Sequence, residues 1–339
     1  MIRAGVVGVS GYSGALTLEI LLKHPQVRVT YAAAQTTSGP IGEVWPRVSG
    51  RTNLTCEIFD LKKAIVNADV FFLAVPHTTA MAIVPGLLKA GKKVIDLSAD
   101  YRLPSASVYK KWYEHEHSDA ANLKHAVYGL PELHREDIKK ATLIANPGCY
   151  PTAAILGLAP LVTTQAPNIG SIVIDAKSGV SGAGKKLTAN LMFTEVNENF
   201  KAYKVLRHQH SPEINLYLSR IASGEVTASF VAHLLPINQG ILETIYIHLK
   251  DKVAISEVEK IYKKFYKTEP FVRVLKAGIQ PEVKNVVGTN YCDIGMEIDE
   301  AGKLLVITSV IDNLYKGAAG QAVQNFNIMC GFKEDEALQ

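Results

Sequence analysis

The first half of the chain alternates short apolar runs with helical stretches, and this pattern strongly restricts its fold. The strand-like runs are IRAGVVG (2–8), VRVTYAAA (27–34), DVFFLAVP (69–76) and KKVIDLSAD (92–100). Between them lie segments with helical spacing of apolar residues, such as ALTLEILLKHP (15–25) and TTAMAIVPGLLKAG (78–91). Runs such as VFFLAV lack polar alternation, as expected of strands that are buried on both faces. The alternation predicts βαβ units and a parallel sheet.

The pattern changes after IANPG (144–148). A helix-like stretch, YPTAAILGLAPLV (150–162), is followed by longer strand-like runs and by a single clear helix, AISEVEKIYKKFYK (254–267). This indicates a second α+β domain with a mostly antiparallel sheet. The last segment, GAAGQAVQNFNIMC (317–330), again has helical spacing and is expected to pack on the first domain. We therefore expect one domain from 1–148 plus 315–339 and another from 149–314, a division that suits 339 residues.

Composition excludes several classes of protein. The formal charge is +4 and no Lys/Arg block occurs, so nothing indicates a nucleic-acid partner. No apolar run reaches the roughly 18 residues that span a bilayer, and the N-terminus does not have a signal-peptide layout, so no membrane association is expected.

The four cysteines are far apart and lack C-x-x-C spacing. We therefore expect neither a tetrathiolate metal site nor a disulfide framework, and a cytoplasmic location.

A glycine-rich turn follows the first strand-like run. GVVGVSGYSG places Gly5, Gly8, Gly11 and Gly14 at intervals of three, directly before a helix. Glycines at this point allow the backbone to approach a pyrophosphate at the helix N-terminus. The spacing departs from G-x-G-x-x-G because Ser10 is an extra residue, and the alternative is a simple tight turn. The strand–turn–helix context favours dinucleotide binding.

The second strand-like run indicates which dinucleotide is bound. NAD enzymes usually carry a carboxylate at its end, whereas YAAAQTTSG (31–39) has none. The hydroxyls of Thr36, Thr37 and Ser38 are able to hold a 2′-phosphate, although the usual arginine is missing from this stretch. NADP is therefore predicted in preference to NAD.

Cys149 follows Gly148 where an apolar run gives way to a helix. It could be buried filler, a metal ligand or a nucleophile. A helix N-terminus lowers the pKa of a thiol, and its free N–H groups stabilise an oxyanion formed when the thiolate attacks a carbonyl. A role as a small buried apolar side chain suits the other three cysteines better than Cys149. The position of Cys149 at a helix start favours its interpretation as a nucleophile.

Two of the ten histidines are close together. In RHQHSPEI (207–214), His208 and His210 alternate and would face the same side of an extended segment. A metal pair is the competing interpretation, but no Cys, Asp or Glu cluster completes a site. We prefer one histidine as general acid/base and the other as substrate ligand. For each of the remaining histidines, a surface position or a satisfied core position is expected.

Two further stretches are suited to anionic ligands. DLSADYRL (96–103) carries Arg102, whose guanidinium can grip a carboxylate or phosphate. KSGVSGAGKK (177–186) is a Gly/Ser loop able to form a backbone nest. Either stretch could equally be an ordinary surface loop.

These stretches together resemble a known family, that of the N-acetyl-γ-glutamyl-phosphate reductases of arginine biosynthesis. The matching motifs, in order from near residue 1 to about 327, are GVSGYSG, DLSADYRL, VYGLPEL, NPGCYPTAAILGLAPL, KSGVSGAG, HQHSPEI, GTNYCDIG and IDNLYKGAAGQAVQNFN. The resemblance implies an N-terminal Rossmann domain and an α+β domain that carries the oligomer contacts, as in aspartate-semialdehyde and glyceraldehyde-3-phosphate dehydrogenases. It also implies a homodimer or homotetramer.

The resemblance assigns roles to individual residues. Cys149 resembles the catalytic nucleophile and His210 the acid/base. The residues that resemble the substrate-binding set are Arg102, His208, Tyr203 and Ser178. Those expected to bind NADP(H) are Gly8, Ser10, Gly11, Tyr12, Ser13, Gly14, Thr36, Ser38, Pro76, Ser181, Gly182 and Asn313. No metal is expected.

The implied reaction is the reduction of N-acetyl-glutamyl 5-phosphate, a small-molecule acyl phosphate, to the 5-semialdehyde and phosphate through a Cys149 thioester, with NADPH as reductant. One position departs from the family, because Gln239 stands where arginine is usual. If that arginine binds the substrate, an alternative is an aminoadipyl or glutamyl phosphate linked to a carrier protein, in lysine or arginine biosynthesis. A nucleotide-sensing regulator without catalysis is the alternative of another class.

Overall fold

A computed structural model describes residues 1–164 and 168–339 of the chain. The chain forms two compact units. The first unit comprises Met1–Gly148 and Ala318–Gln339, and the second comprises Cys149–Gly317. Residues 315–317 thus belong with the second unit. In the part of the chain that the structure describes, no helix is long and apolar enough to cross a membrane.

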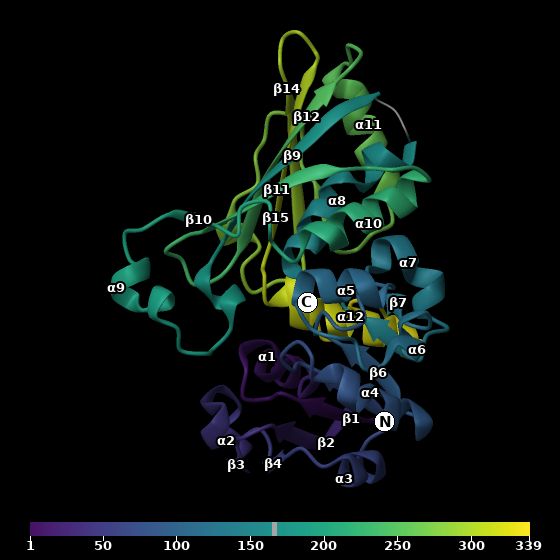
Figure 1. The fold of residues 1–339 in the computed structure, drawn as a ribbon, viewed down its shortest axis with the longest axis vertical. Coiled ribbons are helices and arrows are strands. Elements are labelled where there is room, and N and C mark those ends of the chain that lie inside the picture. Colours follow the sequence, from purple (N-terminus) through teal and green to yellow (C-terminus); the bar gives the residue numbers. More distant parts are fainter. Residues whose placement is uncertain (165–167) are drawn as a thin grey trace. The chain divides into compact units, whose positions relative to one another are not determined.

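The first unit is built on an eight-stranded sheet with the order β3-β4-β2-β1-β5-β6-β8-β7, and its strands are parallel except for the β3–β4 pair. The order runs outward from β1 in both directions, so the β1/β5 boundary is the switch point of the sheet. This arrangement confirms the predicted Rossmann-type sheet (Figure 1). The strands are β1 (Ile2–Val7), β2 (Val27–Ala34), β3 (Gly39–Pro40), β4 (Thr55–Ile58), β5 (Val70–Leu73), β6 (Lys93–Asp96), β7 (Val127–Tyr128) and β8 (Leu143–Ala145).

The helices of the first unit include the C-terminal one, α12, which contacts α1, α7 and β6. Its buried amides bond to main chain and side chain alike: Asn325 Nδ2 donates to Gly129 O (2.8 Å), and Asn327 Oδ1 lies 2.9 Å from His24 Nε2. The helices are α1 (Tyr12–Leu21), α2 (Ile41–Val44), α3 (Leu61–Asn67), α4 (Ala80–Lys89), α5 (Ala106–Tyr113), α6 (Ala120–Leu123), α7 (Pro131–Ile138), α12 (Gly320–Cys330) and the 3-10 turn η1 (Pro46–Val48).

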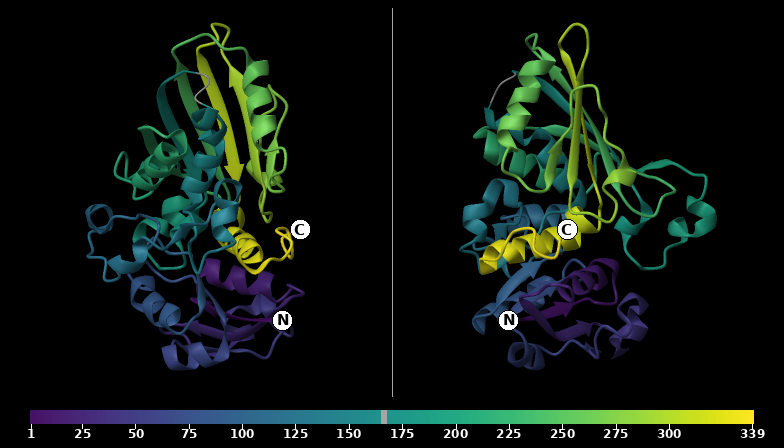
Figure 2. Two further views of the ribbon diagram at one scale, coloured as in Figure 1. Left: turned by 90° about the vertical axis from the view of Figure 1, so that its right-hand side faces the viewer. Right: turned by 180° about the vertical axis from the view of Figure 1, so that it is seen from behind.

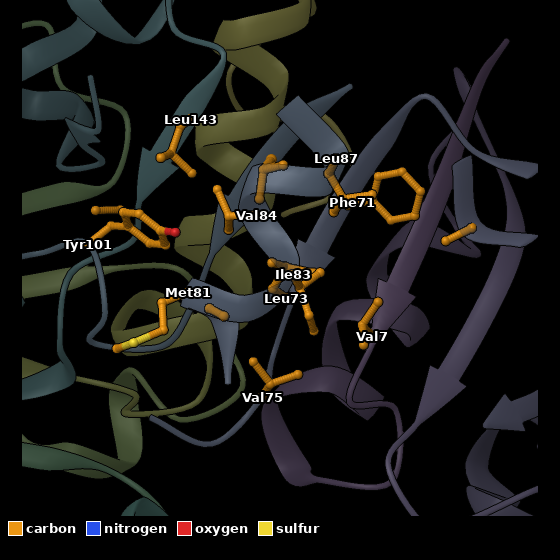
Figure 3. Packing of buried hydrophobic residues seen from close by; sticks show 14 of the residues in the cluster. Val7, Phe71, Leu73, Val75, Met81, Ile83, Val84, Leu87, Tyr101 and Leu143 are labelled. Carbon is orange, nitrogen blue, oxygen red and sulfur yellow. The ribbon is translucent and has the colours of Figure 1, made fainter. Parts of the chain in front are cut away.

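The core of the first unit lies between the sheet and its helices. Figure 3 shows side chains of β5 and α4 packed together, with Tyr101 and Leu143 beside them. Phe71, Leu73, Val84 and Leu87 are fully buried, and burial of each such side chain contributes about 1.5–3 kcal/mol. This packing fixes the strands whose carboxyl ends carry the functional loops.

The second unit is built on a seven-stranded sheet with the order β10-β11-β9-β12-β15-β14-β13. It is mostly antiparallel, as predicted, with parallel pairs only at β9–β11 and β13–β14. The strands are β9 (Ile169–Ser178), β10 (Lys201–Tyr203), β11 (Ala228–Leu234), β12 (Ile241–Leu249), β13 (Val272–Val274), β14 (Cys292–Ile298) and β15 (Leu304–Ile311).

The helices α8, α10 and α11 lie together on one face of this sheet (Figures 1 and 2). The expectation of a single clear helix among the strand-like runs of the second domain is wrong, because α10 begins at the SPEI stretch that follows the histidines. Pro212 and Glu213 occupy its first turn, where both residue types favour a helix start. The helices are α8 (Cys149–Thr164), α9 (Phe193–Val196), α10 (Ser211–Ala222) and α11 (Ile255–Phe265), with the short turns η2 (Val180–Ala183), η3 (Ala189–Leu191), η4 (Val283–Asn285) and η5 (Tyr315–Ala319).

One carboxyl group is buried under these helices. Glu243 of β12 shares the helix-covered face of the strand with Ile241 and Ile245, and it is fully buried. Its cross-strand neighbours are Ser309 and Ala176. Among the described residues, neither Glu243 carboxyl oxygen has a hydrogen-bond partner. Burial raises the pKa of Glu243 well above its ordinary value, and Lys177 opposes this only in part.

We predict that Glu243→Gln stabilises the protein by an amount that grows with pH. Above about pH 4.3 the unfolded chain loses this proton while the folded chain keeps it. The free energy of unfolding of the wild type therefore falls by up to ~1.4 kcal/mol per pH unit until the folded-state pKa is passed. Urea unfolding of both proteins at several pH values measures the difference. The exposed Glu297→Gln of β14 is the control, and a Glu243→Gln difference that does not change with pH would contradict the prediction.

Candidate active site

The turn after β1 uses two of its glycines for its own geometry. Gly8 has φ +99°, and a Cβ there would lie 2.1 Å from Ala74 O. A Cβ on Gly14 would lie 2.1 Å from Gly8 O. Around Gly11, by contrast, the nearest such contact is 3.6 Å away. Gly8 and Gly14 are thus required by the fold, whereas the position of Gly11 leaves room for a ligand close to the backbone.

The start of α1 fits a dinucleotide phosphate. Its N-cap residue is Gly11, no side chain caps the helix, and its first turn has no acidic residue. Ser10, Tyr12 and Ser13 are partly exposed around it. A helix N-terminus with unoccupied N–H groups and positive dipole attracts a phosphate. The residues present therefore fit the pyrophosphate of NADP(H).

Two further predicted cofactor segments lie at the same edge of the sheet. Thr36 and Ser38 follow β2 and are exposed, and Pro76 follows β5 and is exposed. Gln35 Nε2 donates to Thr79 Oγ1 (3.3 Å), so the segments after β2 and β5 are in contact. β1 lies between these two strands, and its glycine turn is next to both segments.

Cys149 is the first residue of α8 and is partly exposed, while the next thirteen residues of the helix, Tyr150–Val162, are buried. The helix N-terminus favours the thiolate form of such a cysteine. Gly317 packs directly on it: a Cβ at Gly317 would lie 2.7 Å from Cys149 Cβ. Sequence reasoning identified the KGAAG segment as specific to the family but not this contact, which only the folded chain reveals.

His208 and His210 lie together, although not in the way predicted. They belong to a turn before α10 rather than to an extended segment, and their ring centroids are 4.8 Å apart. Tyr150, the residue after the cysteine, contacts both rings edge-on at 5.4 and 5.8 Å. Tyr203 lies 5.5 Å from the His208 ring, and its hydroxyl is 3.1 Å from that of Tyr150. The histidines, both tyrosines and the start of α8 thus form one cluster in the second unit.

Hydrogen bonding distinguishes the two histidines. The backbone N–H of His210 donates to His208 Nδ1 (3.2 Å), so His208 carries its proton on Nε2 when neutral. Burial, and to a smaller degree the charge of Lys204, lower the pKa of His208 to about 4. His208 is therefore neutral near pH 7, where its Nε2–H is able to donate a hydrogen bond.

The predicted Gly/Ser loop joins Asn313 in a second cluster. Asn313 Nδ2 donates to Ser181 Oγ (3.0 Å), and Asn313 Oδ1 accepts from the backbone N–H of Gly240 (2.7 Å). Gly182 is exposed beside them, and the buried Ser178 hydroxyl donates to Gly179 O (3.0 Å). Four predicted residues from two distant segments, Ser178, Ser181, Gly182 and Asn313, thus converge in the second unit.

Gln239 contacts this cluster from the other side. Its Nε2 donates to both carboxylate oxygens of Asp312 at 3.1 and 3.0 Å, directly before Asn313. The Asp312 carboxylate also accepts from the backbone N–H groups of Gly288, Leu314 and Tyr315. Gln239 therefore has a structural partner within the protein.

Arg102 is buried and engages main chain in the first unit. Its Nε donates to Asn146 O and its Nη2 to Leu97 O, both at 2.8 Å. Burial, and then the Asp100 carboxylate, raise the pKa of nearby Asp96 to about 7, and Arg102 opposes this shift. These contacts give Arg102 a role in joining the ends of β6 and β8; its predicted role in substrate binding stays a prediction.

Among the residues that the structure describes, no group of three or more His, Cys, Asp or Glu side chains is arranged to hold a metal ion. None of the four cysteines, all of which lie in the described part of the chain, forms a disulfide.

Comparison with known proteins agrees with this geometry. The description "Semialdehyde dehydrogenase, NAD binding domain" matches residues 3–141, and "Semialdehyde dehydrogenase, dimerisation domain" matches residues 149–313. The N-acetyl-gamma-glutamyl-phosphate reductase of Desulfotalea psychrophila is 51% identical over 341 residues, which covers 100% of this chain and 98% of that protein. The reductase of the same name from Desulforamulus reducens is 49% identical, with the same coverage.

This chain belongs to the N-acetyl-γ-glutamyl-phosphate reductase family. The resemblance found in the sequence motifs is thereby confirmed.

Solved structures show the fold of this reductase family member in other enzymes. Aspartate semialdehyde dehydrogenase with NADP from Candida albicans superposes with a TM-score of 0.73 at 16% identity, covering 97% of this chain and 98% of the other. The aspartate semialdehyde dehydrogenase II of Vibrio cholerae complexed with ASA has a TM-score of 0.72 at 16% identity, covering 98% of both chains. The predicted fold class is thus confirmed.

We predict that Gln239→Glu destabilises this reductase family member, whereas Gln239→Arg does not. Glutamate places a second carboxylate against Asp312 and removes two donated hydrogen bonds, at a cost of about 1–3 kcal/mol. Arginine is able to donate to the same carboxylate in a bidentate manner. Chemical unfolding of the three proteins measures the effect. A Gln239→Glu variant as stable as the wild type would show that the Asp312 contact is unimportant.

Proposed function

We propose that the chain catalyses NADPH-dependent reduction of N-acetyl-γ-glutamyl phosphate to N-acetyl-glutamate 5-semialdehyde and phosphate, in arginine biosynthesis. The observation that carries the proposal is Cys149 at the start of α8, whose next residue Tyr150 contacts both His208 and His210, in a chain about half identical to reductases of that name over its full length. The product is an aldehyde, in agreement with the semialdehyde dehydrogenase descriptions that match both units.

Cys149 performs the covalent chemistry. Its thiolate attacks the acyl carbon and expels inorganic phosphate, which leaves a thioester on Sγ. A thioester accepts hydride more readily than an oxygen ester or a carboxylate. Bound NADPH supplies the hydride. The backbone N–H groups at the start of α8 stabilise the negative oxygen of the resulting thiohemiacetal, and its collapse releases the aldehyde and regenerates the thiolate.

His210 is assigned as the acid/base and His208 as a substrate ligand. With a pKa near 4, His208 is neutral at pH 7 and has no second ring proton to give as a general acid. Its Nε2–H is suited to donate a hydrogen bond to a carbonyl or phosphoryl oxygen of the substrate. His210, at the N-cap of α10, takes the proton from the Cys149 thiol before the attack and returns it to the thiolate after the aldehyde is released. Tyr203 and Ser178 remain proposed substrate-side residues. Burial raises the pKa of the Tyr203 hydroxyl to about 12, so it acts as a donor rather than as an anion.

NADP(H) is the proposed cofactor, bound by Gly8 and the segment from Ser10 to Gly14, by Thr36 and Ser38 after β2, and by Pro76 after β5. The proposed contacts from the second unit are Ser181, Gly182 and Asn313. The absence of a carboxylate from residues 31–39 favours NADP over NAD.

The carrier-linked substrate rested on Gln239 alone. Because Gln239 bonds to Asp312 within the protein, this residue alone is not evidence for a different acyl group. We further propose a homo-oligomer formed through residues 149–313, which match a dimerisation domain. A cytoplasmic location suits four free thiols, one of them catalytic.

The reverse reaction tests the proposal. Purified protein is expected to reduce NADP⁺ with N-acetyl-glutamate semialdehyde only when inorganic phosphate is present, and to do so more efficiently than with NAD⁺. Cys149→Ser is expected to lose activity by at least about 10³-fold, because a serine hydroxyl is far less nucleophilic at neutral pH. Cys330→Ser, at a thiol outside the cluster, is the matched control. A fully active Cys149→Ser, or an inactive wild type, would refute the assignment.

The histidines are separated by their effects on rate and pH dependence. His210→Asn is expected to lower kcat by roughly 10²-fold or more, the usual contribution of general acid–base catalysis. His208→Asn is expected to raise KM more than it lowers kcat. Since His208 titrates near 4, any kcat/KM limb between pH 5 and 8 should persist in His208→Asn. The opposite pattern would mean that the two roles are exchanged.

A further inference from the structure

The loop after β5 contains a strained residue. Thr78 has φ +73°, in the left-handed region that side chains branched at Cβ rarely adopt. Its neighbours Pro76 and His77 are exposed, so burial of their side chains does not hold the loop in place. A strained residue in an exposed loop persists only where other contacts fix it.

Asp100 provides those contacts. Its carboxylate is fully buried, and Oδ1 accepts from the backbone N–H of Thr78 at 2.8 Å. Oδ2 accepts from the backbone N–H of Met81, in the first turn of α4, at 3.1 Å. α4 has no side-chain cap of its own, so Asp100 takes that place from a distant segment.

Two further bonds support this arrangement. The hydroxyl of Tyr109 donates to Asp100 Oδ1 (2.7 Å), and the backbone N–H of Ala99 donates to His77 Nδ1 (3.1 Å). The loop is thus joined to the segment after β6 on both sides of Thr78. All these groups lie in the first unit.

The loop occupies the place where a dinucleotide binds to a sheet of this topology. It follows β5, which is paired with β1 at the switch point of the sheet, and ligands bind outside the carboxyl ends of the strands there. Ala74, at the root of the loop, lies against Gly8 so closely that a Cβ on Gly8 would be 2.1 Å from Ala74 O. At its other end, Thr79 accepts a hydrogen bond from Gln35 after β2.

We propose that Asp100 is a positioning residue for cofactor binding, whose carboxylate holds residues 76–79 in the strained conformation against which NADPH binds. The proposal rests on the proposed cofactor. Asp100 touches neither cofactor nor substrate and acts only through the loop. An aspartate suits this role because each of its two oxygens accepts a different backbone N–H, which asparagine cannot do.

The test compares NADPH affinity, measured by quenching of protein fluorescence, in four full-length proteins. Asp100→Asn is expected to weaken NADPH binding about tenfold, since its amide N–H₂ faces one of the two backbone donors. The double variant Asp100→Asn with Thr78→Gly is expected to recover most of the wild-type affinity, because glycine adopts positive φ without strain. Asp119→Asn is the control, since Asp119 is also buried and accepts a tyrosine hydroxyl, from Tyr101 (2.7 Å), but does not contact the loop.

Steady-state kinetics gives a second readout. Asp100→Asn is expected to raise KM for NADPH while kcat at saturating NADPH stays within about twofold of the wild type, a split that general misfolding would not produce. If Asp100→Asn does not fold, Tyr109→Phe replaces it and is expected to weaken NADPH binding about threefold.

The outcomes separate the two proposals. A wild type that does not bind NADPH refutes the proposed cofactor. A wild type that binds NADPH, together with Asp100→Asn or its replacement binding equally well, overturns the role of Asp100. A loss of affinity that Thr78→Gly does not reverse overturns it as well, since the loss then does not come from the strained loop.

Discussion

The parallel arrangement of the first sheet is the constraint on which its functional residues depend. Parallel strands bring all their carboxyl ends to one edge, so segments far apart in the sequence become neighbours there. The glycine turn follows β1, residues 35–38 follow β2, residues 74–79 follow β5 and residues 97–102 follow β6. Buried carboxylates and Arg102 satisfy the main-chain groups that these turns leave without strand partners.

In the second unit, the start of α8 and the turn before α10 form one cluster that includes Cys149 and the two histidines. α8 begins with Cys149, and the aromatic ring of the next residue, Tyr150, contacts both histidine rings. The turn before α10 makes His208 accept a bond from the backbone of His210. This bond fixes the tautomer of neutral His208, and burial lowers its pKa.

Local patterns predicted the fold classes, the strand that precedes the glycine turn and the position of Cys149 at a helix start. Such features depend on the spacing of apolar residues and on turn residues close in sequence. The prediction missed α10, although its apolar residues Ile214, Tyr217, Leu218 and Ala222 have helical spacing and Pro212 and Glu213 mark a helix start, so the sequence did carry a signal for it. It also missed Gly317, Asp100 and Glu243. Their roles depend on partners distant in sequence, such as Cys149 and Thr78, and no local pattern records such contacts. The hydrogen bonds from Gln239 to Asp312 likewise could not be predicted from the sequence.

The contact between Gly317 and Cys149 also has a consequence for when the site can form. Cys149 and Gly317, whose backbone packs against the Cβ of the cysteine, are far apart in the sequence. During synthesis the cysteine emerges from the ribosome long before this neighbour exists. The thiol therefore acquires its final surroundings only after Gly317 has been synthesised, so a nascent chain that stops before Gly317 carries the cysteine without this contact.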